Sequence, residues 1–229
     1  MKKMITALAV LALVTAAPAA AQSGNMSFFI TSAGGGDGAA LGGLAGADQH
    51  CEDLAYVAGV GDLTWHAYLS ALASDGQPAV NARDRIGPGP WYNYAGDMIA
   101  ADVTALHSDA ANLTKESILT ERGAVSNGRG DEPNMHDILT GSNLDGTVFT
   151  GDDYTNCDNW TSNGEGSTRV GHHDRQGGGQ NPNSWNSAHG TRGCSQEALV
   201  GTGGNGFFYC FAIEEGRRQQ PAAARVEPR

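Results

Sequence analysis

The sequence predicts an α+β domain in which short antiparallel strands, one main helix and long loops surround a small core. Glycine accounts for 33 of 229 residues and aromatic residues for only 7%, which is typical of a loop-rich chain rather than a helical bundle. The strand candidates are short, and one stretch stands out by its helical periodicity. A hydrophobic content of 40% still allows a packed centre. Together these features favour small antiparallel sheets with one principal helix.

The main helix is predicted where apolar residues recur at helical spacing ahead of Gly59, a typical helix terminator. The recurring residues are Ala47, Cys51, Leu54, Ala55 and Ala58. Strands are predicted at 28–31, 65–69 and 207–213, hairpins at 91–92 with 98–99 and at 137–141 with 147–149, and a short helical turn at 81–86.

The N-terminus has the pattern of an export signal. Lys2 and Lys3 precede an uncharged, mostly apolar stretch, and small residues end it at Ala21. This order of regions is that of a secretory signal peptide, and its apolar part is short for a membrane span. We expect residues 1–21 to be removed and the protein to be periplasmic or secreted, without membrane insertion.

The segment from Thr161 to Gly193 contains eight glycines together with histidine, asparagine and tryptophan side chains. A long segment without predicted secondary structure inside a compact domain is uncommon and is usually functional or disordered. We therefore expect this loop, together with residues 131–134, to form a binding surface. After Glu215 the composition becomes rich in Arg, Ala and Pro, and residues 216–229 are expected to be a disordered tail.

Four cysteines in an exported chain predict two disulfides. The spacing alone allows three connectivities, and no pair has the CxxC spacing of a redox or zinc motif.

The arrangement of these elements over residues 26–215 resembles a C-type-lectin-like domain. In both, the main helix carries the first cysteine, the last strand carries the fourth, and two cysteines lie between. The segments 41–51, 65–70, 82–85, 138–146 and 157–160 and the final strand are similar to endostatin, a member of that superfamily. The whole resembles exported bacterial proteins labelled lectins. The resemblance implies bridges Cys51–Cys210 and Cys157–Cys194 and a non-catalytic binding role.

Two short motifs suggest how a sugar would bind. Glu132-Pro133-Asn134 resembles the specificity tripeptide of calcium-dependent lectins, and Trp185-Asn186 resembles part of their tryptophan–asparagine–aspartate motif, with Ser187 in place of the aspartate. Glu132 and Asn134 would then offer oxygen ligands to calcium. The alternative is an ordinary polar turn.

Trp185 also suggests a site without metal, in which its ring stacks on a sugar. The neighbouring amides that would bind the hydroxyls are Asn181, Asn183 and Asn186. The alternative is that Trp185 fills the core beneath the loop.

Histidines in and near the loop raise a third possibility, a transition-metal site. The candidate ligands are His136, His172, His173, Asp174 and His189, although no HxH or HExxH spacing is present. A metal-dependent hydrolase built on His172 and His173 is accordingly kept as an alternative function.

The net charge of −11 disfavours nucleic acid as a partner. Signatures of nucleophilic enzymes and phosphate loops are absent from the sequence. The expected function is therefore non-catalytic carbohydrate binding, with a glycan or another envelope or extracellular ligand as partner. The alternative from another class is an envelope module that binds protein.

Overall fold

The computed structural model describes residues 22–213 and has the predicted α+β character, with short helices and three small antiparallel sheets. The expected signal segment 1–21 and tail 216–229 lie outside the described residues. Within residues 22–213, no helix is long and apolar enough to cross a membrane.

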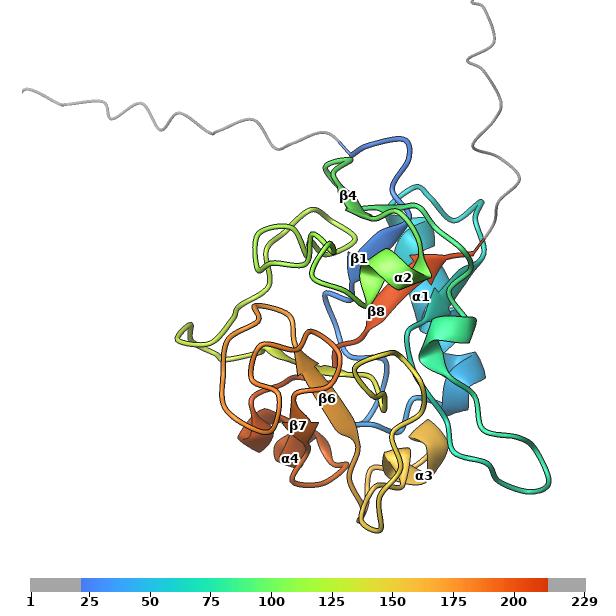
Figure 1. Ribbon diagram of the computed structural model, residues 1–229, viewed down its shortest axis with the longest axis vertical. Coiled ribbons are helices and arrows are strands. Elements are labelled where there is room, and N and C mark those ends of the chain that lie inside the picture. The colour runs from blue at the N-terminus through green and yellow to red at the C-terminus, as the bar shows by residue number, and fades with distance from the viewer. Residues whose placement is uncertain (1–21, 214–229) are drawn as a thin grey trace, which may run out of the picture.

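The central sheet joins the beginning and the end of the described chain. Its strands are β1 (Phe28–Ile30), β2 (Trp65–Ala67) and β8 (Tyr209–Ala212), in the order β1-β8-β2. Both pairings are antiparallel, and β8 lies in the middle. Figure 1 shows β1 and β8 side by side. The three predicted strands are confirmed.

Alternate residues of these strands face two hydrophobic clusters. Phe29 and Trp65 belong to one cluster, whereas Phe28 and Phe211 belong to the other. All four side chains are fully buried. The sheet is therefore covered on both faces, which explains why its strands are almost entirely apolar.

The main helix α1 (Gly43–Val57) packs beside β2 and confirms the predicted helix. Its buried face consists of Ala47, Cys51 and Ala55. A disulfide joins Cys51 to Cys210 of β8, so that the helix is bonded covalently to the central sheet.

The hairpin of β3 (Trp91–Tyr92) and β4 (Met98–Ala100) is also confirmed, as is a short helical turn, η1 (Ala82–Asp84). A short helix, α2 (Val103–Leu106), follows the hairpin. The sequence did not predict it, because four residues are too few to show a helical period.

The second predicted hairpin, 137–141 with 147–149, has the wrong pairing. Strand β5 (Asp137–Leu139) pairs with β6 (Arg169–His172), and β6 pairs with β7 (His189–Gly190). Residues 147–149 provide only a single bridge, between Val148 and Ser142. The segment 161–193, expected to lack secondary structure, thus supplies two strands, and helix α4 (Gln196–Thr202) follows it.

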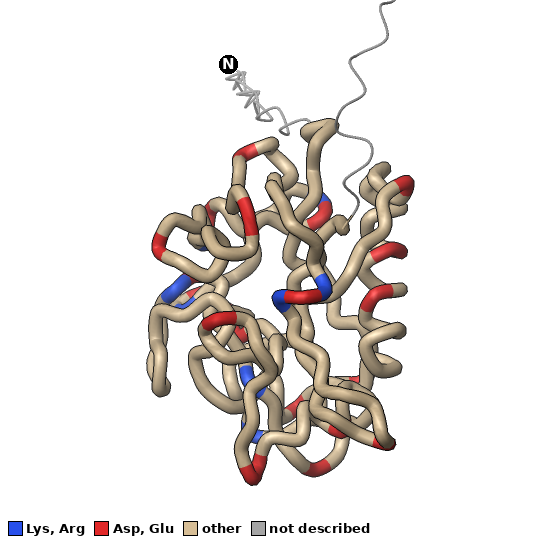
Figure 2. The backbone as a smooth tube through the Cα atoms, turned by 45° about the vertical axis from the view of Figure 1, so that its right-hand side comes forward, with Lys and Arg blue, Asp and Glu red and all other residues tan. Residues whose placement is uncertain are grey.

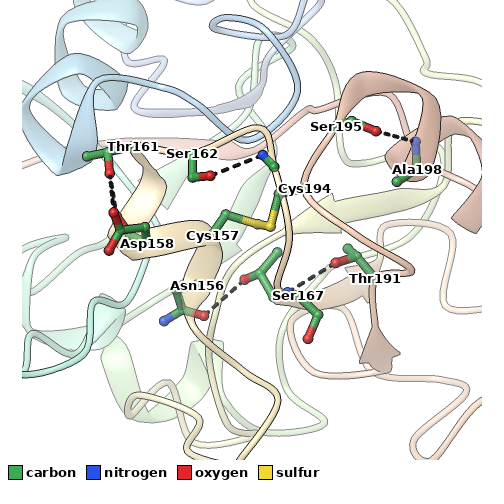
Figure 3. The surroundings of a disulfide bond; sticks show 12 residues. Asn156, Cys157, Asp158, Thr161, Ser162, Ser167, Thr191, Cys194, Ser195 and Ala198 are labelled. Atoms are coloured by element: carbon green, nitrogen blue, oxygen red, sulfur yellow. Dashed lines mark hydrogen bonds between the residues drawn. A yellow bond between two sulfur atoms is a disulfide. The ribbon is translucent and has the colours of Figure 1, made fainter.

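The second disulfide, Cys157–Cys194, ties the turn before β6 to the chain before α4, as Figure 3 shows. The turn is α3 (Asn156–Trp160), in which all five residues have positive φ angles of 48–70°. Left-handed backbone is costly outside glycine. Here Trp160 Nε1 donates to the Ser70 carbonyl at 2.8 Å, and the Asn159 side chain accepts from the Leu72 amide at 2.7 Å. Both disulfides have the pairing that the resemblance implied.

Candidate functional site

The segment between β6 and β7 folds back on itself and does not form an open loop. The backbone amide of His172 donates to the Ser184 carbonyl at 2.8 Å, and that of Asn181 donates to the Ala188 carbonyl at 3.0 Å. The Asn181 side chain also donates to the Ser187 carbonyl at 2.8 Å. These bonds give residues 180–188 a defined shape, although this segment has few apolar residues.

An open cleft of about 580 Å³ lies beside this segment. One wall comes from residues 180–186, and the other comes from the turn after α2 and from Leu144. The lining residues are His107, Ser108, Asp109, Leu144, Arg175, Gln180, Asn181, Pro182, Asn183, Ser184, Trp185 and Asn186. Amide, hydroxyl and charged groups are thus concentrated on one surface.

A second cleft of about 410 Å³ adjoins the first, because Leu144, Gln180 and Asn181 line both. Its far side includes Phe149 and Arg169. The Arg169 guanidinium lies 4.5 Å from the centre of the Phe149 ring, and its Nη2 donates to Gln180 Oε1 at 2.8 Å. We call the two clefts together the amide groove.

Trp185 is part of the core. Its side chain is 4% exposed, and its ring centre lies 4.8 Å from that of Tyr68 and 5.4 Å from that of Tyr209. The expectation of an exposed stacking platform is therefore wrong, and the alternative, a tryptophan that fills the core beneath the loop, describes what the structure has. Trp185 supports the amide groove from within.

Asn186 is buried as well, with 1% exposure. Its Nδ2 lies 3.0 Å from both the Tyr68 hydroxyl and the Asn143 carbonyl oxygen, and its Oδ1 accepts from Ser184 Oγ at 3.0 Å. Its hydrogen-bonding groups are used inside the protein, so this side chain holds the groove in shape. Asn183, by contrast, is exposed at the groove.

The groove has a neutral hydrogen-bonded pair at its base. Burial raises the pKa of Tyr68 far above its ordinary value, and burial also lowers the pKa of His107. The Tyr68 hydroxyl lies 2.7 Å from His107 Nε2, and His107 Nδ1 lies 2.8 Å from the Val103 carbonyl oxygen. A neutral His107 therefore donates from Nδ1 to the Val103 carbonyl, and its Nε2 accepts a hydrogen bond from the Tyr68 hydroxyl.

Glu132 and Asn134 line neither cleft of the amide groove. Glu132 is exposed, and Asn134 Oδ1 accepts from the backbone amide of His136 at 3.4 Å. The structure thus does not bring the tripeptide and Trp185-Asn186 together on one cleft, as a shared calcium and sugar site would require.

The histidine candidates separate into two groups. His173 Nε2 lies 3.0 Å from the Asn127 carbonyl oxygen, whereas His172 Nε2 lies 2.9 Å from His189 Nε2. The two adjacent rings of the hydrolase alternative, His172 and His173, therefore have different surroundings. His136 and His172 meet at Asp137, a residue that the sequence analysis did not select.

Asp174 lies behind His136 and does not face Asp137. Burial acts to raise the pKa of Asp174. The hydrogen bonds from His136 and from the backbone amides of Arg129 and Gln176 nevertheless hold this pKa well below its usual range. Burial acts to lower the pKa of His136, but the hydrogen bond with Asp174 and the charge of Asp137 outweigh this effect and raise the pKa.

The chain was compared with models of known protein families and with curated proteins, and neither comparison found a match.

Proposed function

We propose that this protein is an exported C-type-lectin-like domain of the endostatin kind that binds a glycan, without catalysis, in the amide groove. The observation that carries the proposal is the concentration of exposed amide groups on two adjoining clefts. Gln180 and Asn181 stand between the clefts, and Asn183 lies at the edge of the larger one. A ligand that spans both clefts would contact Gln180 and Asn181 from two sides.

The chemistry of these side chains suits sugar hydroxyls. An amide side chain both donates and accepts hydrogen bonds, as a hydroxyl does, and neutral groups suffice to bind a neutral sugar. Asp109 and Arg175 add one acceptor and one donor group at the larger cleft. Its volume of about 580 Å³ is in the usual range of small-molecule sites.

The covalent framework supports the lectin-like part of the proposal. The disulfide of α1 with the last strand and the inner bridge Cys157–Cys194 have the connectivity that the resemblance implied. Disulfides of this kind also fit an oxidising compartment outside the cytoplasm. The periplasm or the extracellular medium is accordingly where we propose that the protein acts.

We propose that recognition in the amide groove needs no calcium, because Glu132 and Asn134 lie elsewhere. The test is a glycan array probed with the mature, oxidised protein, with and without added calcium. The informative variant is Asn183→Ala, since this side chain is exposed and, unlike Gln180, does not accept a hydrogen bond from the buried Arg169. We expect retention to fall by about fivefold with an unchanged Tm, because one lost hydrogen bond contributes about 1 kcal/mol.

Gln49→Ala is the matched control, because Gln49 lies on α1 and its side-chain amide donates only to the neighbouring Asp53. Full retention by the groove variant would refute the site. Retention that requires calcium would favour Glu132 and Asn134 instead, and an array without any bound glycan would favour a protein ligand.

A further inference from the structure

Three strands bring four side chains to one point beneath the amide groove. Asp137 on β5 lies opposite His172 on β6, and His189 on β7 lies opposite Val170, two residues before His172. Residues that are opposite or two apart share a face of a sheet, so all three side chains project to the same side. His136 completes the set, and its ring stacks on that of His172 with centres 4.3 Å apart.

The ligand atoms of His136, Asp137 and His172 lie within 4.8 Å of one another, and that of His189 adjoins two of them. Asp137 Oδ1 lies 3.3 Å from His136 Nε2, 3.3 Å from His172 Nε2 and 3.5 Å from His189 Nε2. The last two nitrogens are 2.9 Å apart. The side chains of His136, Asp137 and His172 are no more than 7% exposed, and that of His189 is 24% exposed.

The hydrogen-bond partner of Nδ1 in each ring determines which nitrogen carries the proton. His136 Nδ1 lies 3.3 Å from Asp174 Oδ1, and His172 Nδ1 lies 2.7 Å from the Pro182 carbonyl oxygen. His189 Nδ1 lies 3.1 Å from the Gly190 carbonyl oxygen. Because all three partners can only accept, each Nδ1 carries a hydrogen, and in a neutral ring Nε2 is left with a lone pair.

When all three rings are neutral, three lone pairs therefore point at the Asp137 carboxylate. Both oxygens of Asp137 are buried and lack a hydrogen-bond partner, despite the nearby ring nitrogens. Buried polar groups in proteins are almost always satisfied, and a buried charge needs a counter-charge. The charge of Asp137 therefore calls for positive charge at this centre, which a bound metal ion would supply to all of the ligand atoms at once.

We propose that His136, Asp137, His172 and His189 bind one divalent transition-metal ion of the zinc class. Zinc bonds to nitrogen and carboxylate oxygen are about 2.0–2.2 Å long, so two ligands of a tetrahedral site lie about 3.4 Å apart. Four of the six separations between these ligand atoms are 2.9–3.5 Å, which is close to this spacing before any adjustment to an ion. Imidazole nitrogen suits zinc, nickel or copper, whereas calcium takes oxygen ligands.

The site is closed and structural. Four protein ligands complete a tetrahedral zinc site, whereas a catalytic one keeps a position for water. The carbonyl and carboxylate groups behind the rings orient the ligands, as the outer partners of metal-bound histidines do. Glycine allows the surrounding loop to approach closely, because a side chain at Gly177 would collide with the His172 ring, and a Cβ at Gly179 would lie 2.8 Å from His189 Cδ2.

The ion would join β5, β6 and β7 and hold the segment whose outer side lines the amide groove. This role does not depend on what binds in the groove, because the ligand atoms face the interior. The metal proposal can therefore hold even if the protein binds no glycan.

The test measures the metal itself. The mature, oxidised protein is stripped with a chelator and titrated with Zn²⁺ against a chromophoric competitor, and with Co²⁺ as a spectroscopic probe. We expect one ion per chain, a rise in Tm with Zn²⁺, and the strong visible absorption of tetrahedral cobalt. His189→Gln removes one ligand at the least buried position, and we expect it to weaken Zn²⁺ binding by about 100-fold or more, beyond the effect of an outer partner.

His50→Gln is the control, because this half-buried histidine on α1 contacts the Ala33 carbonyl and lies apart from the cluster. It should bind Zn²⁺ as the wild type does. Asp137→Asn should abolish binding if it folds, and His189→Gln decides the question if it does not. Absence of stoichiometric Zn²⁺, unchanged affinity in His189→Gln, or the weak absorption of octahedral cobalt would overturn the proposal.

Discussion

Tyr68 and His107 form the contact at the base of the amide groove, and it depends on protonation. Nε2 of His107 accepts a hydrogen bond from the Tyr68 hydroxyl, which requires a neutral ring. Burial lowers the pKa of His107, and the bond to the Val103 carbonyl offsets only part of that effect. The unfolded chain, in which the pKa of this histidine is ordinary, therefore binds a proton more readily than the folded chain.

This difference predicts a loss of stability in acid. The contribution of neutral His107 is complete above the ordinary histidine pKa of about 6.5 and declines as the pH falls toward the lowered folded pKa. Denaturant unfolding at pH 7.5 and 5.5 measures it against His107→Gln, whose side chain accepts the Tyr68 hydroxyl but does not titrate. We expect the wild type to lose more stability than the variant over this interval. Equal losses would contradict a lowered pKa.

The sequence indicated the right region for several of these residues but not their orientation. Asn183 is exposed at a cleft, as a binding residue must be, whereas Trp185 and Asn186 lie within two or three positions of it and are buried. Nothing in the residue types distinguishes the three. Asp137 lacked any signal, because its role follows from its place opposite His172, and that pairing was not predicted.

Among the elements, the inner disulfide holds the most unusual backbone. The bridge Cys157–Cys194 closes a loop of sequence separation 37, and Cys157 belongs to a left-handed turn without glycine. Figure 3 shows hydrogen bonds at both ends of the bridge, among them the Ser195 side chain, which accepts from the Ala198 amide at the start of α4. The bridge thus joins α3 to the segment between β7 and α4.

Replacing both cysteines of this bridge by alanine should lower the free energy of unfolding by about 4 kcal/mol, the chain-entropy value for a loop of this length. Loss of the left-handed turn adds to the effect, since nothing else crosslinks it covalently to β7 and α4. Urea unfolding of the double variant under oxidising conditions is the measurement. A cost below about 1 kcal/mol would mean that hydrogen bonds alone hold the turn.

Most of the longer elements that the sequence predicted correctly have an apolar period. Helix α1 and strands β1, β2 and β8 bury continuous or alternating apolar residues, and their signals are local. Strand β6 reads Arg-Val-Gly-His and β7 has two residues, so neither shows a pattern. Helix α4 is short and buries only Leu199, and its local signal is the Ser195 cap. Long-range pairing and the disulfide, rather than propensity, define this half of the molecule.

The whole molecule is strongly acidic. Residues 22–213 carry eight Lys or Arg side chains and 22 Asp or Glu side chains. Figure 2 shows the acidic positions distributed over helices and loops on every visible side, with few basic ones between them. Such a surface repels anionic ligands at long range, and salt screens the repulsion beyond about 8–10 Å at physiological ionic strength.

This charge predicts which glycans the proposed site in the amide groove would select. A neutral oligosaccharide should be retained equally at low and high salt, because its hydrogen bonds with Gln180 and Asn183 involve no net charge. A sulfated form of the same oligosaccharide should bind more weakly at low salt and recover as salt is added. Titrations of both ligands at two ionic strengths measure this. If the sulfated ligand binds better and is released by salt, Arg175 at the cleft outweighs the overall charge, and the natural ligand is an anionic glycan.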